Sequence, residues 1–312
     1  MSGQVIDGRK IADQLKRGVA RGVDDLRAGG VVCGLTTIRV GDDFSSITYQ
    51  ARLARIGREL GVNVVDVCLP EGVGQHGVID AVKRANTDPA TSGILVLRPL
   101  PRDVSEAMVF QNLLPEKDIE AVHPENAGLL ALGAPRYIPS TAASVFHVLD
   151  EWLDEVGEDR TEFYHRARIV VVGRSNNVGK PLVSLAYDRQ AAVESVDEWA
   201  SYTHRLSSHT RRADVLVCAA GVPGLIQAEH VRAGAVVLDV GINPKVDADT
   251  GRTHIVGDVA FDTVLNRVRA ITPVPGGIGP VTDVWLMRNV VKAARCSTNN
   301  ALPGSHAEED ET

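Results

Sequence analysis

Aromatic side chains are scarce in this sequence, because Phe, Trp and Tyr together make up 4% of its 312 residues. A core must then be built mainly from valine, leucine, isoleucine and alanine, which is typical of buried parallel strands covered by amphipathic helices. Cysteine is also rare, and the four cysteines lie far apart in apolar runs without a C-x-x-C pair. We therefore expect reduced core thiols, with no disulfide framework and no metal site.

Long apolar runs, a signal peptide and a basic stripe are absent too. No run is long enough to cross a bilayer and the N-terminus lacks a signal-peptide layout, so we expect a cytoplasmic protein without a membrane partner. Basic residues do not interleave with aromatics, which argues against nucleic acid as a partner. The net charge of −7 is mild, and four carboxylates lie in the polar tail 306–312, which is predicted to be disordered.

The chain is too long for one ordinary core, and its pattern alternates strands with helices, which predicts two α/β domains. In the first half, the helix from Gly8 to Ala28 carries apolar residues at helical spacing, and Ser45 and Ser46 are candidate N-caps for a second helix. The predicted strands are 31–40, 62–69, 93–97, 168–172, 192–196, 215–219, 235–240 and 254–256, and the other predicted helices are 47–60, 78–85, 178–187 and 282–295. We place hinges near Pro139 and in the charged stretch 150–168.

The turn between the strand 168–172 and the helix after it is a candidate dinucleotide site. Gly173 ends the strand and Gly179 begins the helix, where backbone N–H groups and the helix dipole favour a pyrophosphate. The spacing is G-x5-G and not G-x-G-x-x-G, so an ordinary turn of an α/β protein remains an alternative. Gly221 and Gly241 end two neighbouring strands at the edge where α/β ligands bind, which favours the dinucleotide.

Two side chains bear on which dinucleotide is bound. Asp197 follows the next strand, where a carboxylate accepts a hydrogen bond from the adenosine ribose and repels a 2′-phosphate. Arg174 lies inside the turn and favours phosphate. Because Asp197 and Glu198 also fit a solvated helix start, the choice between NAD and NADP stays open at this point.

Several segments together resemble the methylenetetrahydrofolate dehydrogenase/cyclohydrolase (FolD-type) family over roughly residues 4–295. They are Val40-Gly-Asp-Asp43 with Ser45 and Tyr49, Pro115-Glu-Lys-Asp118 with His123-Pro124 and Asn126, Gly173-Arg-Ser175 with Val178-Gly179, Asp239-Val-Gly-Ile-Asn243, Gly257-Asp-Val259, and Thr272-Pro-Val-Pro-Gly-Gly-Ile-Gly-Pro-Val-Thr282. The last segment is the most specific of these strings.

The resemblance implies a folate-binding domain at 1–140, a Rossmann-type NAD(P)-binding domain at 141–281, a cleft between them, and a helix at 282–297 that packs back on the first domain before the disordered tail 298–312. It implies oxidation of methylene-tetrahydrofolate with NAD or NADP by a homodimer. Tyr49 and Glu120 would be the catalytic residues. The other implied substrate residues are Ser45, Asp258, Pro275, Gly276, Gly277 and Thr282, and the implied cofactor residues are Gly173, Arg174, Ser175, Val178, Gly179, Asp197, Gly221, Gly241 and Ile242.

The sequence departs from the family pattern at the positions that the resemblance assigns to proton transfer and to the pterin. Leu53 stands at the family's catalytic lysine, Leu97 at its glutamine, and Glu120 at an aspartate. Hydride transfer needs mainly positioning, whereas cyclohydrolysis needs a general acid/base that two leucines do not supply. We therefore expect a dehydrogenase with weak or no cyclohydrolase activity. The alternatives are a bifunctional enzyme in which another group substitutes, such as Arg98 through a water, and a non-catalytic or different-substrate paralogue.

Four further polar residues carry weaker expectations. His123, in a His-Pro turn, is expected to be structural. Asp258 either binds the folate, which we favour slightly, or caps a turn. His204 and His209 are expected on the surface of a loop.

Overall fold

The computed structural model describes residues 3–246 and 251–299, which form two compact units. Unit 1 combines residues from 1–15 and 128–285, and unit 2 combines residues from 16–127 and 286–312. The helices α1 (Gly8–Ala28) and α12 (Ile278–Asn299) contribute to both units. The change of unit falls at Gly128, before the hinge that we expected near Pro139. The expected tail lies outside the described residues from position 300 onward.

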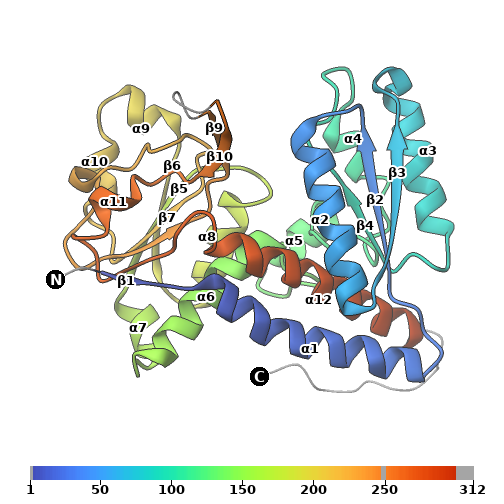
Figure 1. Cartoon of the computed structure of the whole chain (residues 1–312), viewed down its shortest axis with the longest axis horizontal. Helices are drawn as coiled ribbons and strands as arrows, with labels where there is room; N and C mark the ends of the chain where they lie inside the picture. Colours follow the sequence, from blue (N-terminus) through green and yellow to red (C-terminus); the bar gives the residue numbers. More distant parts are fainter. Residues whose placement is uncertain (1–2, 247–250, 300–312) are drawn as a thin grey trace. The chain divides into compact units, whose positions relative to one another are not determined.

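Unit 2 is a three-layer α/β structure around a parallel sheet in the order β3-β2-β4. Its strands are β2 (Gly34–Val40), β3 (Asn63–Leu69) and β4 (Gly93–Val96), and the connecting helices are α2 (Phe44–Leu60) and α3 (Gly74–Thr87). The two crossovers lead to opposite edges of β2, so right-handed connections place α2 and α3 on opposite faces of the sheet, as Figure 1 shows. The predicted elements of this half are confirmed, with ends that differ by a few residues.

The start of α2 corrects one prediction. Asp43, and not Ser45 or Ser46, is the N-cap, because its carboxylate accepts the Ser46 N–H at 2.9 Å. Both serine hydroxyls donate to the same carboxylate oxygen, and these bonds lower the pKa of Asp43, with the Ser45 hydroxyl contributing most. A carboxylate at the helix N-terminus also interacts favourably with the helix dipole, which a serine cannot do.

Unit 1 contains a six-stranded parallel sheet in the order β1-β11-β8-β7-β5-β6. The strands are β1 (Gln4–Val5), β5 (Arg168–Val172), β6 (Ala192–Val196), β7 (Val215–Cys218), β8 (Val236–Asp239) and β11 (Ala270–Ile271). The chain leaves β5 for β6 on one side and returns to β7 on the other, so the doubly wound sheet predicted for this half is confirmed. The sequence pattern missed β1 and β11, which have two residues each.

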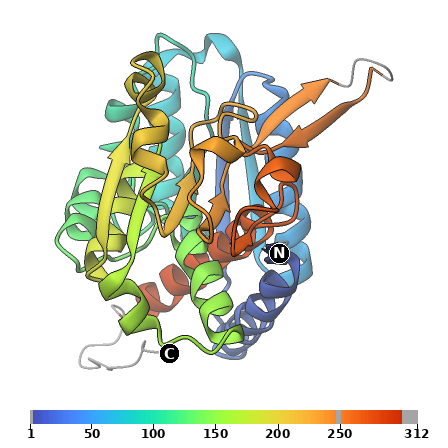
Figure 2. The same cartoon turned by 90° about the vertical axis from the view of Figure 1, so that its left-hand side faces the viewer.

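The strand predicted near residue 254 lies outside that sheet. It is β10 (Thr253–Val256), which pairs antiparallel with β9 (Asn243–Val246) in a separate hairpin. Figure 2 shows this hairpin as an orange arm that extends away from the sheet. The apolar residues of β10 are few, and a short apolar run does not reveal which strand it pairs with.

The charged stretch in which we expected a hinge is helical. It contains α6 (Ser140–Glu155) and α7 (Arg160–Arg166). One face of α6 is apolar and almost fully buried, including Phe146, Leu149 and Trp152, while Asp154 pairs with Arg160 on the exposed side. The charges that suggested a hinge therefore mark the solvent face of amphipathic helices.

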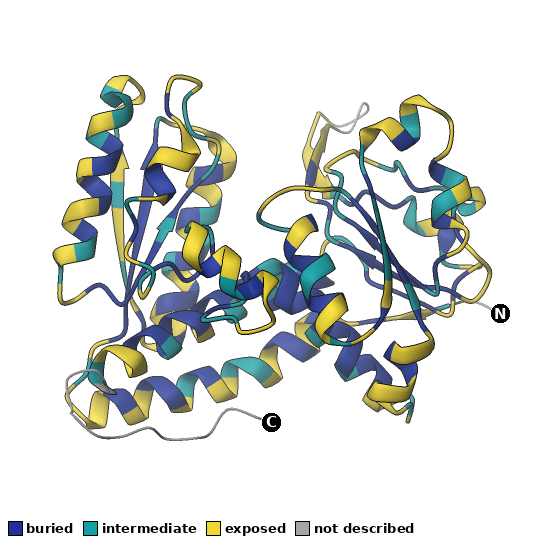
Figure 3. Ribbon diagram, turned by 180° about the vertical axis from the view of Figure 1, so that it is seen from behind, coloured by how far each residue is buried: buried dark blue, intermediate teal, exposed yellow. Residues whose placement is uncertain are grey.

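Burial follows the strands in both units. In Figure 3 the central strands are drawn as continuous buried segments, whereas the helices alternate between buried and exposed residues. None of the described helices is long and apolar enough to span a membrane. The remaining helical elements are η1 (Glu71–Val73), α4 (Glu106–Phe110), α5 (Pro124–Ala131), α8 (Gly179–Asp188), α9 (Glu198–Tyr202), α10 (Leu206–Thr210), η2 (Ala228–His230) and α11 (Phe261–Val264).

One non-glycine residue in unit 2 has a left-handed backbone. Ala121 has φ of 50° at the end of the segment that runs beside β4, where the Ile94 N–H donates to the Lys117 carbonyl. This conformation costs an L-residue about 1–2 kcal/mol. Glycine adopts it without that penalty.

We expect Ala121→Gly to leave the free energy of unfolding within about 0.5 kcal/mol of the wild type, because the relieved backbone strain offsets both the roughly 0.8 kcal/mol lost with one buried methyl group and the greater backbone entropy of glycine in the unfolded chain. The matched control is Ala127→Gly on an exposed turn of α5, which should destabilise by about 1 kcal/mol. Urea denaturation measures both. An equal loss of stability in the two variants would show that Ala121 is not strained.

Candidate functional site

The turn after β5 requires glycine at both of its ends. Gly173 has φ of 121°, and a Cβ there would lie 2.2 Å from the carbonyl oxygen of Ala219, directly after β7, which neighbours β5 in the sheet. A Cβ on Gly179 would lie 2.2 Å from the carbonyl oxygen of Gly173. The two glycines of the G-x5-G pattern therefore touch one another, which folds the turn tightly against the carboxyl edge of the sheet.

Ser175 closes the inside of this turn. Its hydroxyl accepts the Gly179 N–H at 3.3 Å, and its carbonyl accepts the Lys180 N–H at 3.0 Å. Pro181 has no N–H, and the Leu182 N–H donates to the Val178 carbonyl at 3.0 Å. The first N–H groups of α8 are thus engaged by the turn itself.

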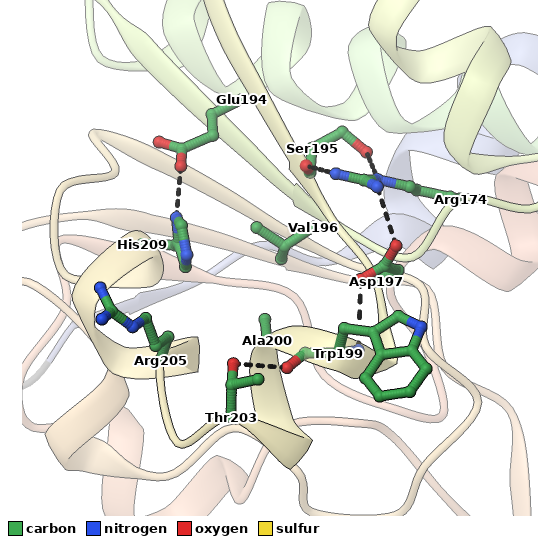
Figure 4. A pocket seen from close by; sticks show the side chains of 10 residues that line it. All are labelled: Arg174, Glu194, Ser195, Val196, Asp197, Trp199, Ala200, Thr203, Arg205 and His209. Atoms are coloured by element: carbon green, nitrogen blue, oxygen red, sulfur yellow. Dashed lines mark hydrogen bonds and ion pairs between the residues drawn. The ribbon is translucent and has the colours of Figure 1, made fainter.

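Arg174 and Asp197 lie together at the end of β6. Arg174 Nη1 donates to Asp197 Oδ2 at 2.8 Å, and the other side of the guanidinium donates to the carbonyl of Ser195 at 2.5 Å. Asp197 also caps α9 by accepting the Trp199 N–H at 3.2 Å. Figure 4 shows these contacts at one side of a pocket. The two residues that pointed to different cofactors are therefore partners of each other.

Two buried aspartates organise the ends of β7 and β8. The Asp258 carboxylate accepts the N–H groups of residues 220–222, which include Gly221, at 2.6–3.0 Å and the Asn243 amide at 2.9 Å. The Asp239 carboxylate accepts the N–H groups of Gly241, Asp258 and Val259 at 2.9–3.0 Å. This brings Gly221 and Gly241 together beside the turn at Gly173, on strands adjacent in the sheet.

Asp258 therefore has a structural role in this network. It is completely buried, and both carboxylate oxygens already accept hydrogen bonds from the chain. We favoured a folate contact for it from the sequence, and the geometry supports the alternative, a turn-holding carboxylate. Ile242, in contrast, is 57% exposed next to this network and is free to contact a ligand.

Asp239 has a strongly altered acidity. Its burial raises the pKa to about 6, although three backbone N–H donors stabilise the ionised form. A Cβ on Gly257 would lie 1.8 Å from Asp239 Oδ2, so only glycine leaves room for this carboxylate. The sequence indicated neither feature, because a strand-end aspartate is common in loops of every kind.

The Pro-Gly-Gly loop lies at the start of α1. A Cβ on Gly8 would lie 1.8 Å from the Gly277 carbonyl oxygen, and a Cβ on Gly277 would lie 2.6 Å from the Thr272 Cβ. Gly276 has φ of 114°, next to exposed Pro275. The loop residues expected at the substrate are thus held in a close backbone contact with α1. Thr282 lies one turn into α12 and donates to the Ile278 carbonyl at 3.2 Å.

In unit 2, α2 divides the predicted site residues between two faces. Tyr49 is half-buried, and the guanidinium of Arg52 lies 5.0 Å from its ring centre. Leu53 is completely buried on the core face with Gln50, which donates to Thr37 and accepts from Arg39. Ser45 is exposed, and its hydroxyl is bonded to Asp43.

The segment that carries Glu120 is fixed from two sides. Asp118 accepts the N–H groups of Val122 and His123 and the amide of Asn126, while the Asn289 amide of α12 donates to the Ile119 carbonyl at 2.8 Å. Burial raises the pKa of Asp118, the largest of the influences on it. Half-buried Glu120 is therefore presented by a rigid segment. His123 accepts the Glu125 N–H, in keeping with its expected structural role.

Comparisons with known proteins show the family of the chain. The family model of the tetrahydrofolate dehydrogenase/cyclohydrolase catalytic domain matches residues 6–120, and that of the NAD(P)-binding domain matches residues 139–298. The chain belongs to the tetrahydrofolate dehydrogenase/cyclohydrolase family. It is 52% identical over 313 residues to bifunctional protein FolD 3 of Rubrobacter xylanophilus, which covers 98% of each chain. The resemblance found in the sequence is therefore confirmed.

Solved structures of the family have the same fold. The methylenetetrahydrofolate dehydrogenase-cyclohydrolase of Trypanosoma brucei, solved with NADP and an inhibitor, matches with a TM-score of 0.86 at 33% identity, over 96% of this chain and 99% of that one. The bifunctional FolD enzyme of Campylobacter jejuni matches with a TM-score of 0.85 at 31% identity, over 95% and 100% of the two chains. The predicted α/β fold with a Rossmann-type sheet is thus confirmed.

The glycine contact in the turn yields a first test of the dinucleotide site. Gly179→Ala should destabilise the protein by about 1–3 kcal/mol and weaken dinucleotide binding at least tenfold, because the turn must open to admit the methyl group. The control is Gly18→Ala in exposed α1, where a Cβ meets nothing within 4 Å. Calorimetric titration should show unchanged binding for that control, and unchanged binding for Gly179→Ala would contradict the assignment.

The buried Asp239 carboxyl predicts a pH dependence. A folded pKa of about 6, above the ordinary 3.8, means that the fold favours the protonated form. Its contribution is fully present below the ordinary pKa and is lost as the pH rises through 6. The difference in free energy of unfolding between the wild type and Asp239→Asn should therefore shift against the wild type by about 2–2.5 kcal/mol from pH 4 to pH 7. A difference that stays constant with pH would refute this.

Proposed function

We propose that this chain oxidises 5,10-methylenetetrahydrofolate to 5,10-methenyltetrahydrofolate with NAD or NADP, and that it hydrolyses the product weakly or not at all. The main support for dehydrogenase activity is the turn in which Gly173 and Gly179 are in contact. This turn lies beside the neighbouring strand ends at Gly221 and Gly241. Relatives across the whole chain are bifunctional FolD proteins, which supports a folate as the substrate.

For the oxidation, the protein has mainly to position the folate and the nicotinamide against each other. A bound nicotinamide would supply the hydride acceptor, and the protein has to hold the folate carbon against it away from water. We assign Tyr49 to orienting the folate ring and Glu120 to accepting hydrogen bonds from its amino group. The rigid attachment of the Glu120 segment to β4 and α12 supports this role. The Gly276-Gly277 backbone is suited to close approach because neither residue has a side chain.

The chain has leucines at the two positions where the family resemblance implies proton-transfer groups for hydrolysis. Leu53 is 0% exposed and Leu97 is 4% exposed, so neither position offers even a water-accessible polar atom. Arg98 was the candidate substitute, but its Nε donates to both carboxylate oxygens of Glu106 at 3.1 Å and its guanidinium lies 4.7 Å from the ring centre of Phe110. An arginine that is held in this way and stays charged is a poor proton carrier.

Two alternatives differ in what they predict. A bifunctional enzyme with a substitute acid/base hydrolyses methenyltetrahydrofolate, and a binding-only or different-substrate paralogue reduces neither cofactor with methylenetetrahydrofolate. The retained Tyr49 and the intact loop from Thr272 to Thr282 favour an enzyme over a binding protein. We include in the proposal a cytoplasmic homodimer, as the resemblance implies, and light scattering after gel filtration tests the dimer.

The decisive assay follows reduced nicotinamide by absorbance with methylenetetrahydrofolate and each cofactor. We expect turnover with at least one of them, and no rate with either eliminates the proposal. In a second assay, decay of methenyltetrahydrofolate should proceed no more than about twofold faster with the enzyme than in buffer. Enzyme-dependent hydrolysis that Tyr49→Phe abolishes would refute the loss of cyclohydrolase activity.

Restoring the lost groups provides the matching gain-of-function test. Leu53→Lys combined with Leu97→Gln should raise hydrolysis at least tenfold over the wild type. Leu53→Met with Leu97→Gln is the control, because it keeps an unbranched side chain of similar reach without a titratable group. Equal rates in the two double variants would show that the lysine position does not limit hydrolysis.

A further inference from the structure

A pocket at the carboxyl end of β6 adjoins the dinucleotide turn. Its volume is about 310 Å³, and it opens between the strand end and the helices α9 and α10. Val196 and Ala200 supply apolar surface, and Trp199 is 64% exposed at one side. In a doubly wound sheet this strand end is where the adenosine part of a dinucleotide lies. The charges that line the pocket therefore decide whether the bound dinucleotide has a hydroxyl or a phosphate at the 2′ position of that ribose.

The cation nearest to the turn is engaged by the chain. Arg174 uses three of its five N–H donors on β6 and its end: one on Asp197 Oδ2 at 2.8 Å, one on the Ser195 carbonyl at 2.5 Å and one on the Ser195 hydroxyl at 3.3 Å. A guanidinium binds a phosphate best through two parallel donors. The two N–H donors that remain, one on Nη1 and one on Nη2, lie beside the Asp197 carboxylate, so a phosphate that they bound would meet that negative charge.

Asp197 is suited to a hydroxyl and unsuited to a phosphate. One of its oxygens accepts from Trp199 and the other from Arg174, so each retains acceptor capacity, and the side chain is 29% exposed. A ribose 2′-hydroxyl can donate to this carboxylate. A 2′-phosphate would bring about two negative charges against Asp197 and against exposed Glu198 next to it.

The other basic side chains of the pocket are on its opposite side. Figure 4 shows His209 and Arg205 across the pocket from the Arg174–Asp197 pair. His209 is hydrogen-bonded to Glu194, so it too has a carboxylate partner. Within the described part of the chain, Arg205 is the lining cation without a carboxylate partner, and it is the group to test as an alternative phosphate site.

From these contacts we propose that the chain selects NAD over NADP, with Asp197 as the specificity-determining residue and Arg174 as the residue that positions it. This inference rests on the proposed function only in taking a nicotinamide dinucleotide as the cofactor. Arg174 by itself would suit a phosphate. In the ion pair it instead holds the Asp197 carboxylate in place, and that carboxylate repels a phosphate.

The test measures binding without folate, by calorimetric titration of the full chain with NAD+, NADP+ and the fragments 5′-AMP and 2′,5′-ADP. The wild type should bind NAD+ at least tenfold more tightly than NADP+. Asp197→Ser frees Arg174 and should lower that ratio at least tenfold. Adding Arg174→Gln to Asp197→Ser should abolish the gain in NADP+ affinity.

The control Asp154→Ser breaks another exposed ion pair, between Asp154 of α6 and Arg160 of α7, and should leave the ratio unchanged. Equal binding of both dinucleotides by the wild type, or an unchanged ratio in Asp197→Ser, would overturn the inference. A tenfold loss of NADP+ affinity in Arg205→Gln with NAD+ binding retained would place the phosphate at Arg205 and overturn it as well. Selective NAD+ binding without folate oxidation would instead sink the proposed function and leave this inference standing.

Discussion

The carboxyl edge of the six-stranded sheet depends on two buried carboxylates that take up the backbone donors of the surrounding loops. Asp239 and Asp258 together accept six backbone N–H groups and one side-chain amide. Buried N–H groups without acceptors are costly, so these loops keep their shape only while both carboxylates are present. The glycines at 241 and 257 follow from the same constraint, since any side chain there would occupy the space of a carboxylate oxygen. Strand ends held in this way form a fixed platform beside the turn at Gly173.

The two buried carboxylates lower the stability of the fold but fix the conformation of the loops around them. Burying the Asp239 carboxylate is unfavourable, and its raised pKa expresses that cost. A core of apolar residues would not incur it, but such a core has no acceptors with which to hold three loops in a chosen conformation. The left-handed Ala121 in unit 2 illustrates the same balance, because the segment that presents Glu120 is fixed by Asp118 and Asn289 even though its backbone is strained.

Sequence reasoning located the long, periodic elements and the glycine turn, because their signals are local. The helix 8–28 and the strands 168–172 and 192–196 have the predicted bounds, and Gly173 and Gly179 are where a tight turn needs them. It missed β1 and β11, whose two residues carry no periodicity, and it placed β10 in the wrong sheet, since pairing is decided by distant segments. It also treated His209 as a surface loop residue, although His209 lies in α10 and pairs with Glu194. The structural role of Asp258 was open for the same reason: its partners are 15–38 residues away.

The residues proposed for the cofactor and for the folate are held in different ways. At the turn after β5, a carboxylate at the end of β6 pairs with Arg174. On α2 and after β4, the positions where the family resemblance implies proton-transfer groups hold leucines that belong to the apolar core. Polar groups are expensive to bury, so at positions as buried as Leu53 and Leu97 a packed leucine is more stable than a lysine or a glutamine. The proposed role in binding and hydride transfer depends on positioning and makes no demand for titratable side chains at these two places.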